Sequence, residues 1–113
     1  MNYQEIMERL KMLEFHQKLL LKMVKETNLG FYRLIVEKSL TQTEVNDLLL
    51  ACESLSKDFQ KQKAEGFVNF HPLFDKFNAI LPPKLRSGEI IPACLEQGLY
   101  VPLMMELKRY LKD

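Results

Sequence analysis

Two histidines and two cysteines are the side chains of this sequence best suited to metal binding or nucleophilic catalysis. His16, His71, Cys52 and Cys94 are widely separated and match no recognised zinc-ligand spacing. A Cys–His pair would need an accessible thiolate in electropositive surroundings to act as a nucleophile. Both cysteines lie among apolar residues, so we interpret them as reduced core residues. We predict no catalytic residue, no metal site and no cofactor.

Other common chemical signatures are weak in this sequence. The four glycines are isolated and form no phosphate-binding loop, and no pair of carboxylates stands out. Four phenylalanines cluster at helical spacing, which predicts core packing: Phe67, Phe70, Phe74 and Phe77. We therefore expect that the protein is not an enzyme. A small enzyme or ligand carrier that uses this Phe-rich region stays as an alternative.

The charge balance argues against dedicated nucleic-acid binding. Sixteen basic and fifteen acidic residues give a formal net charge of +1, whereas nucleic-acid binders carry a basic excess. Lys11, Lys18 and Lys25 recur every seven residues, but glutamates interleave with them, as on a solvated helix face. A DNA-binding regulator with a helix-turn-helix-like unit around Ser39-Leu40-Thr41 is the first alternative function. Gln42 and Asn46 are the only residues early in the following helix that are suited to reading bases, which argues against this alternative.

The elements that would position these residues are all helices. Apolar residues recur at helical spacing, and no segment shows sustained alternation, so we predict an all-α fold. One chain of 113 residues suits a single multihelical domain, 1–113, of five to six helices with a long N-terminal amphipathic helix. The expected helices span about 3–26, 31–39, 42–64, 70–81, 89–97 and 101–112.

Local signals set the ends of several helices. Thr41 and Glu44 form a capping box, and Leu40 and Val45 occupy the two positions of a hydrophobic staple around it. A helix should therefore begin at Gln42. Asn69 is expected to cap the fourth helix, with Pro72 in its first turn. Ser87 or Gly88 would start the fifth helix early, but Pro92 suits a helix interior poorly, so we place its regular part later.

The first helix carries two apolar stripes. One is a heptad seam, a repeat typical of helices that pair, formed by Ile6, Leu10, Leu13, Gln17, Leu20 and Val24. The other lies on roughly the opposite side and consists of Met12, Phe15, Leu19 and Met23. We predict that the seam is an oligomer interface, and that the Met/Phe stripe packs on the chain's own third and last helices. Gln17 within the seam would set register and copy number.

The sequence also favours a cytoplasmic location. The N-terminal segment is acidic and polar, unlike a signal peptide, and no apolar run reaches the roughly 20 residues of a membrane span. We therefore expect no membrane partner. The expected partners are a second copy of the chain, with a dimer favoured and a trimer possible, and an unknown protein.

Several blocks of the sequence resemble the YhaI-like family of small uncharacterised bacterial proteins. In chain order these blocks are Phe31-Tyr32, Leu40-Thr41 with Glu44, Ala64-Glu65-Gly66-Phe67-Val68, and Glu96-Gln97-Gly98-Leu99-Tyr100. The resemblance extends over nearly the whole chain. It implies an all-helical, cytosolic protein of Firmicute-type bacteria, and it carries over no functional residue because that family has no assigned activity. A small homo-oligomeric helical protein that acts through protein contacts is therefore our leading hypothesis.

Overall fold

The computed structural model describes residues 2–25 and 27–112, which form helices without strands. This confirms the all-α prediction. The helices are α1 (Tyr3–Lys25), α2 (Gly30–Glu37), α3 (Gln42–Ala64), α4 (His71–Ile80), α5 (Ser87–Gln97) and α6 (Val101–Lys108).

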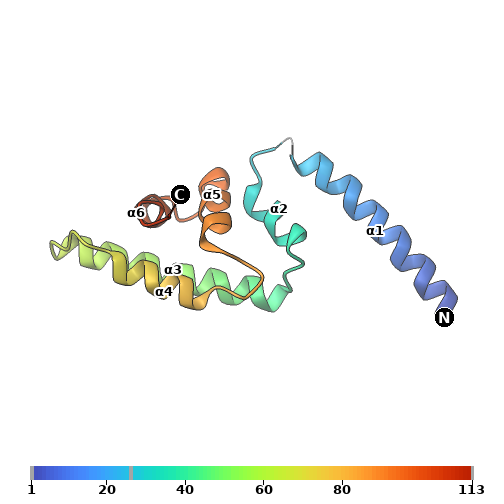
Figure 1. The fold of residues 1–113 in the computed structure, drawn as a ribbon, viewed down its shortest axis with the longest axis horizontal. Helices are drawn as coiled ribbons and strands as arrows, with labels where there is room; N and C mark the ends of the chain where they lie inside the picture. The colour runs from blue at the N-terminus through green and yellow to red at the C-terminus, as the bar shows by residue number, and fades with distance from the viewer. Residues whose placement is uncertain (1, 26, 113) are drawn as a thin grey trace.

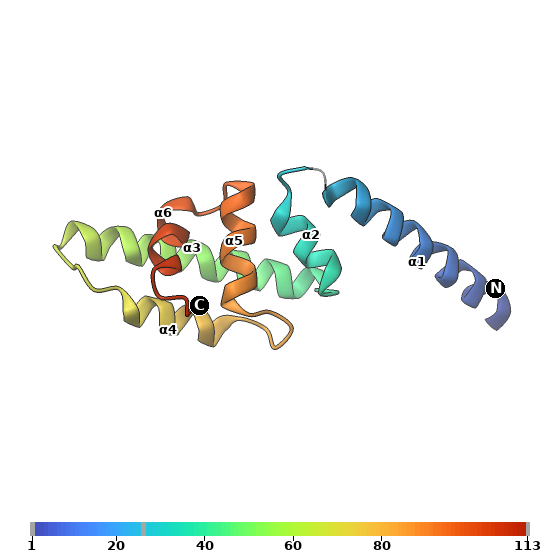
Figure 2. The same cartoon turned by 45° about the horizontal axis from the view of Figure 1, so that its top comes forward.

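Helices α2 to α6 pack together, and α1 projects away from them. The long helix α3 lies alongside α4, while α5 and α6 lie across this pair (Figures 1 and 2). Helix α2 packs on α5, and α1 meets the rest of the chain at α2. The projecting helix lengthens the molecule to 61 × 28 × 23 Å.

The core lies between α3, α4, α5 and α6, and α2 covers one side of it. Its apolar side chains include Phe77, Leu103, Met104 and Leu107, each fully buried. Within the described residues no polar or charged side chain is buried. Because α1 contributes no buried residue, the core is complete without it.

The capping box at the start of α3 is confirmed. The Thr41 hydroxyl accepts a hydrogen bond from the Glu44 amide at 3.1 Å, and the Thr41 amide donates to the Glu44 carboxylate at 2.9 Å. The Lys84 ammonium lies 3.0 Å from the same carboxylate. The hydrogen bond from the Thr41 amide is the main cause of the lowered pKa of Glu44, and the hydrogen bond from Lys84 lowers it further. Leu40 and Val45, the two staple positions, are partly buried and pack against the core.

Thr41→Ala should lower the free energy of unfolding by about 1 kcal/mol, because the substitution removes the hydroxyl that caps α3. Chemical denaturation followed by circular dichroism measures this loss. Thr43→Ala is the matched control, because Thr43 is an exposed threonine in the same helical turn. Equal denaturation midpoints for the two variants would contradict a stabilising cap.

The fifth helix begins at Ser87, two residues earlier than expected, and includes Pro92. Proline removes the hydrogen bond to the carbonyl four residues earlier, here that of Gly88. Both residues are exposed, so water can solvate that carbonyl. Neighbouring Ile91 and Ala93 are buried, and their packing outweighs the lost hydrogen bond.

The ends of α4 and α6 also differ from expectation. Phe70, and not Asn69, occupies the cap position of α4, while the Asn69 side chain accepts a hydrogen bond from the His71 amide at 3.1 Å. Helix α6 ends at Lys108, short of the expected residue 112. Beyond it, the Tyr110 hydroxyl accepts a hydrogen bond from the Phe70 amide at 3.0 Å. This long-range contact ties the end of the chain to α4.

Candidate functional site

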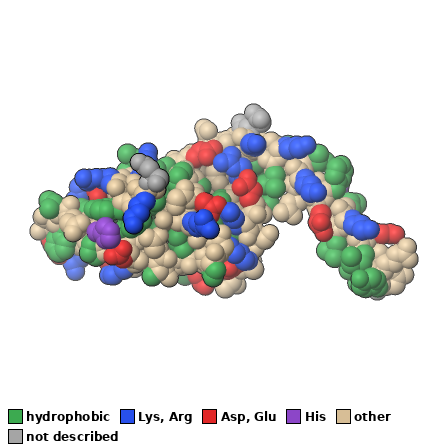
Figure 3. Space-filling model, in the orientation of Figure 1, with side chains coloured by type: hydrophobic (Ala, Val, Ile, Leu, Met, Phe, Trp, Pro, Cys, Tyr) green, Lys and Arg blue, Asp and Glu red, His purple; other side chains and the backbone are tan. Residues whose placement is uncertain are grey.

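Helix α1 exposes more apolar surface than a typical surface helix. It has no buried residue over its 23 residues, and its exposed large apolar side chains belong to both predicted stripes. Figure 3 shows hydrophobic side chains along the projecting arm. The most exposed fractions are 78% for Tyr3, 66% for Met23, 59% for Phe15 and 57% for Leu20. Large contiguous apolar patches on a monomer are typical of interaction sites.

The C-terminal half of the heptad seam lies beside α2. Together the two helices line an apolar groove of about 520 Å³, formed by Leu13, His16, Gln17, Leu20, Leu21, Val24, Tyr32, Arg33 and Val36. The Gln17 amide nitrogen lies 3.5 Å from the Val36 carbonyl oxygen, which is at the long limit for a hydrogen bond. Leu13 and Leu20 remain 52% and 57% exposed. Helix α2 therefore borders the seam without covering it.

The prediction that the Met/Phe stripe packs on the third and last helices is wrong. Met12, Phe15, Leu19 and Met23 are 43–66% exposed, and α1 points away from α3 and α6 (Figure 1). At the end of α1, the Thr27 hydroxyl donates a hydrogen bond to the Val24 carbonyl at 2.6 Å. Helix α1 instead makes its main contacts with α2.

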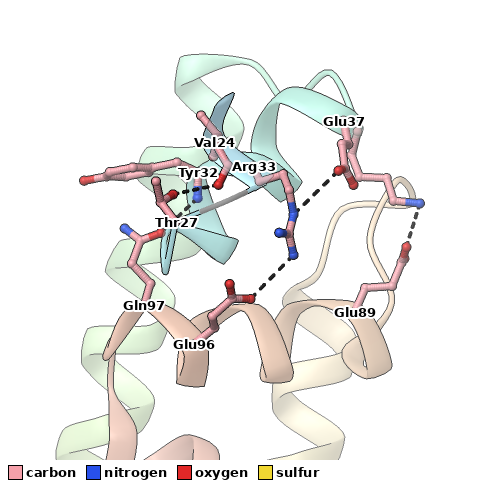
Figure 4. A network of polar contacts seen from close by, with 9 residues as sticks. Val24, Thr27, Tyr32, Arg33, Glu37, Glu89, Glu96 and Gln97 are labelled. Atoms are coloured by element: carbon pink, nitrogen blue, oxygen red, sulfur yellow. Dashed lines mark hydrogen bonds and ion pairs between the residues drawn. The ribbon is translucent and has the colours of Figure 1, made fainter. Parts of the chain in front are cut away.

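A polar network fastens α2 to α5 and so fixes one wall of the groove (Figure 4). The Arg33 guanidinium lies 3.5 Å from Glu96, and the Tyr32 amide donates to the Gln97 side chain at 3.0 Å. Lys38 and Glu89 form an ion pair at 2.6 Å. The hydrogen bond from Lys38 is the main cause of the lowered pKa of Glu89.

Close packing at Gly30 reinforces this junction. A Cβ atom at this position would lie 3.2 Å from the Ala93 carbonyl oxygen and 2.5 Å from the Glu96 carboxylate. Glycine therefore lets the start of α2 approach α5 closely. The sequence interpretation treated Gly30 only as one of four isolated glycines, and it missed Tyr32, Arg33 and Val36 as parts of the groove. The available signal was the spacing of Tyr32 and Val36, which places two apolar side chains on one exposed face of α2.

The two cysteines are core residues, as predicted. Cys52 and Cys94 are free and each is 2% exposed. Burial raises the pKa of Cys52 to about 11 and that of Cys94 to about 12. Both thiols are therefore protonated near neutral pH, and a protonated thiol is a poor nucleophile.

The histidines lie apart from the cysteines and from each other. His16 lines the groove on α1, whereas His71 lies at the start of α4, 3.3 Å from the Asp75 carboxylate. The His71 ring also packs edge-on against Tyr110, with 5.3 Å between ring centres. Within residues 2–25 and 27–112 no three His, Cys, Asp or Glu side chains are grouped as metal ligands.

The Phe-rich region is divided between core and surface. Phe70 and Phe77 are buried, with the Phe70 ring 4.9 Å from that of Phe59, while Phe67 is 50% exposed. Phe74 borders a hollow of about 460 Å³ whose other lining residues are mostly polar: His71, Asp75, Asn78, Ser87, Gly88, Tyr110, Leu111 and Lys112. His71 and Asp75 are more than half exposed and contact each other, so two polar groups of the hollow already satisfy one another.

The first turns of α3 offer a poor surface for DNA. Gln42 and Asn46, the only residues early in α3 suited to reading bases, are exposed, but the exposed Asp47 directly follows Asn46. Its carboxylate would repel the phosphate backbone, whose neutralisation supplies much of the affinity of DNA-binding proteins.

Comparison with protein families places the chain in one of them. The profile of a family described as "Protein of unknown function (DUF1878)" matches residues 3–112. The chain belongs to this family. The match covers α1 as well as the helices of the core. The resemblance implied membership of an uncharacterised family over nearly the whole chain, and the profile match shows this. The YhaI-like name stays a prediction.

The family's description assigns no activity, so no functional residue passes from it to this chain. No described helix combines the length and apolar character needed to cross a membrane. The exposed face of α1, with its groove against α2, is thus the candidate functional site that the structure marks out best.

Proposed function

We propose that this protein is a cytoplasmic homo-oligomer that associates through the heptad seam of α1 and acts by binding proteins, not by catalysis. One observation carries the proposal: a 23-residue helix with a heptad seam has no buried residue in its own chain. The free, buried cysteines support a reducing compartment. We also propose that the family is the YhaI-like one.

The exposed seam holds enough apolar surface for association. Ile6, Leu10, Leu13 and Leu20 are 43–57% exposed. Full burial of such a side chain contributes about 1.5–3 kcal/mol. About half of each of these four side chains is exposed in each copy, so burying that exposed part in both copies contributes on the order of 8 kcal/mol. Association costs roughly 4–15 kcal/mol. The two terms are comparable, so further contacts from Val24 and from the α2 wall determine the final affinity.

A dimer is the expected assembly. Two-fold dimers are the commonest homo-oligomers. The Met/Phe stripe would then stay exposed and would be free to bind a different protein. Its methionines have flexible side chains that adapt to irregular partner surfaces.

Light scattering coupled to size exclusion tests the proposal on the full chain. At micromolar concentration we expect a mass twice the 13.3 kDa of one copy. The elution volume alone is a poor guide, because the elongated shape mimics a larger particle. A mass of one copy at this concentration would overturn the proposal.

A further inference from the structure

We infer that two copies pair their α1 helices in parallel, with Gln17 facing Gln17 and with Arg9 of each copy facing Glu14 of the other. This inference rests on the proposed self-association and gives it a direction and a register. It also explains why the seam contains a polar residue.

The seam defines the heptad positions of the charges that flank it. With Leu10, Gln17 and Val24 at position a and Ile6, Leu13 and Leu20 at position d, Arg9 falls at g and Glu14 at e. In a parallel pair, the g residue of one helix faces the following e residue of the other. Arg9 then meets Glu14 of the second copy, and two-fold symmetry makes this contact twice. Charges at e and g set the orientation of such pairs.

The antiparallel arrangement lacks this complementarity. There, e faces e and g faces g, so the two Glu14 carboxylates would oppose each other at the centre of the pair. Arg9 would then meet Met23, which has no charge. Like charges brought together disfavour an assembly, and the parallel pairing avoids this contact.

Both charged residues are available for the contact. Arg9 and Glu14 are exposed, and neither joins an ion pair within the described part of the chain. Neither residue lines the groove with α2. Helix α1 projects away from the other helices, which leaves room beside it for a second helix (Figure 2).

Gln17 favours the same arrangement. In the parallel pair its amide faces the identical amide of the second copy, and each amide can donate to and accept from the other. In the antiparallel pair it would face Leu13 and lose hydrogen bonds on burial, which is costly. Its hydrogen bond to the Val36 carbonyl is at the long limit, 3.5 Å, and it involves only the amide nitrogen, so the amide oxygen is still free to accept.

Disulfide trapping in the full chain tests the direction. In parallel pairs each seam residue faces the same residue of the other copy. Ile6→Cys should therefore form a disulfide-linked dimer under mild oxidation. In antiparallel pairs Ile6 lies opposite Val24, so only a mixture of Ile6→Cys and Val24→Cys chains would link. Leu50→Cys is the control, because Leu50 is 71% exposed on α3, away from the seam. The unsubstituted chain controls for Cys52 and Cys94.

Charge exchange gives a second measurement that does not depend on oxidation. Arg9→Glu and Glu14→Arg should each raise the dissociation constant of the dimer roughly 3- to 10-fold, and the double variant should return it towards the original value. Antiparallel pairing predicts no such rescue, because Arg9 and Glu14 would not meet.

The outcomes separate this inference from the proposed function. A dimer by light scattering in which Ile6→Cys links no better than Leu50→Cys, or in which the charge exchange gives no rescue, would overturn the parallel pairing alone. A monomeric mass for the unsubstituted chain would overturn both. A linked Ile6→Cys dimer together with rescue would support the parallel pairing.

Discussion

Replacing Leu13 and Leu20 with aspartate should convert the oligomer into a folded monomer. Sequence reasoning predicts either a monomer or an unfolded chain for this double variant. The structure selects the first outcome, because both leucines are more than half exposed and α1 contributes no residue to the core. Helices α2 to α6 should therefore fold as before.

The expected effect on association is large. Each copy would bring two carboxylates into the centre of an apolar interface, and burial of an unpaired charge costs several kcal/mol. The substitutions also remove the free energy that burial of the two leucine side chains contributes to association. Dimer formation at micromolar concentration should disappear altogether.

Light scattering measures the mass of this variant, and circular dichroism reports whether it is folded. Leu50→Asp is the matched control, since Leu50 is 71% exposed on α3 and lies away from the seam. It should leave the mass unchanged. A double variant that still forms dimers would mean that another surface holds the copies together.

Phe77→Ala should cause one of the largest losses of stability among truncations of core side chains in this protein. Phe77 lies on α4 and is 0% exposed. Truncation of a buried phenylalanine costs about 3–5 kcal/mol, from lost burial and from the cavity left behind. A domain of this size has a total stability of roughly 5–15 kcal/mol, so the variant should unfold at a much lower denaturant concentration or fail to fold.

Chemical denaturation at one fixed protein concentration measures this loss, because association adds to the apparent stability of an oligomer. Phe67→Ala is the control within the same Phe-rich region. Phe67 is 50% exposed, so its truncation should cost about 1 kcal/mol or less. Similar losses for the two variants would show that the region is not divided into core and surface.

Much of the fold follows from local rules that act within a few residues. The capping box of Thr41 and Glu44 involves two residues in one helical turn, so it is visible in the sequence and correct in the structure. The α5 start was misplaced because Pro92 is unfavourable by local rules, whereas burial of Ile91 and Ala93 overrides it. Such compensation comes from distant residues.

The candidate site shows the same division. The apolar seam of α1 and its Gln17 are properties of spacing, so they can be predicted from the sequence. The groove with Tyr32 and Val36 depends on the direction of α1 after Lys25 and on the anchoring of α2 by Arg33 and Glu96. These contacts join residues far apart in the chain, and periodicity carries no information about them.

The sequence alone determined that this protein is all-helical, that its cysteines belong to the core, and that its first helix carries more apolar surface than one face can bury. Periodicity and local capping encode these properties directly. Only the tertiary structure decided that α1 projects from the core, with its Met/Phe stripe uncovered and its seam open beside α2. The reason is physical: the core of α2 to α6 is closed by contacts between residues far apart in the chain, and α1 adds no buried side chain to it. The apolar pattern within one helix does not encode such contacts.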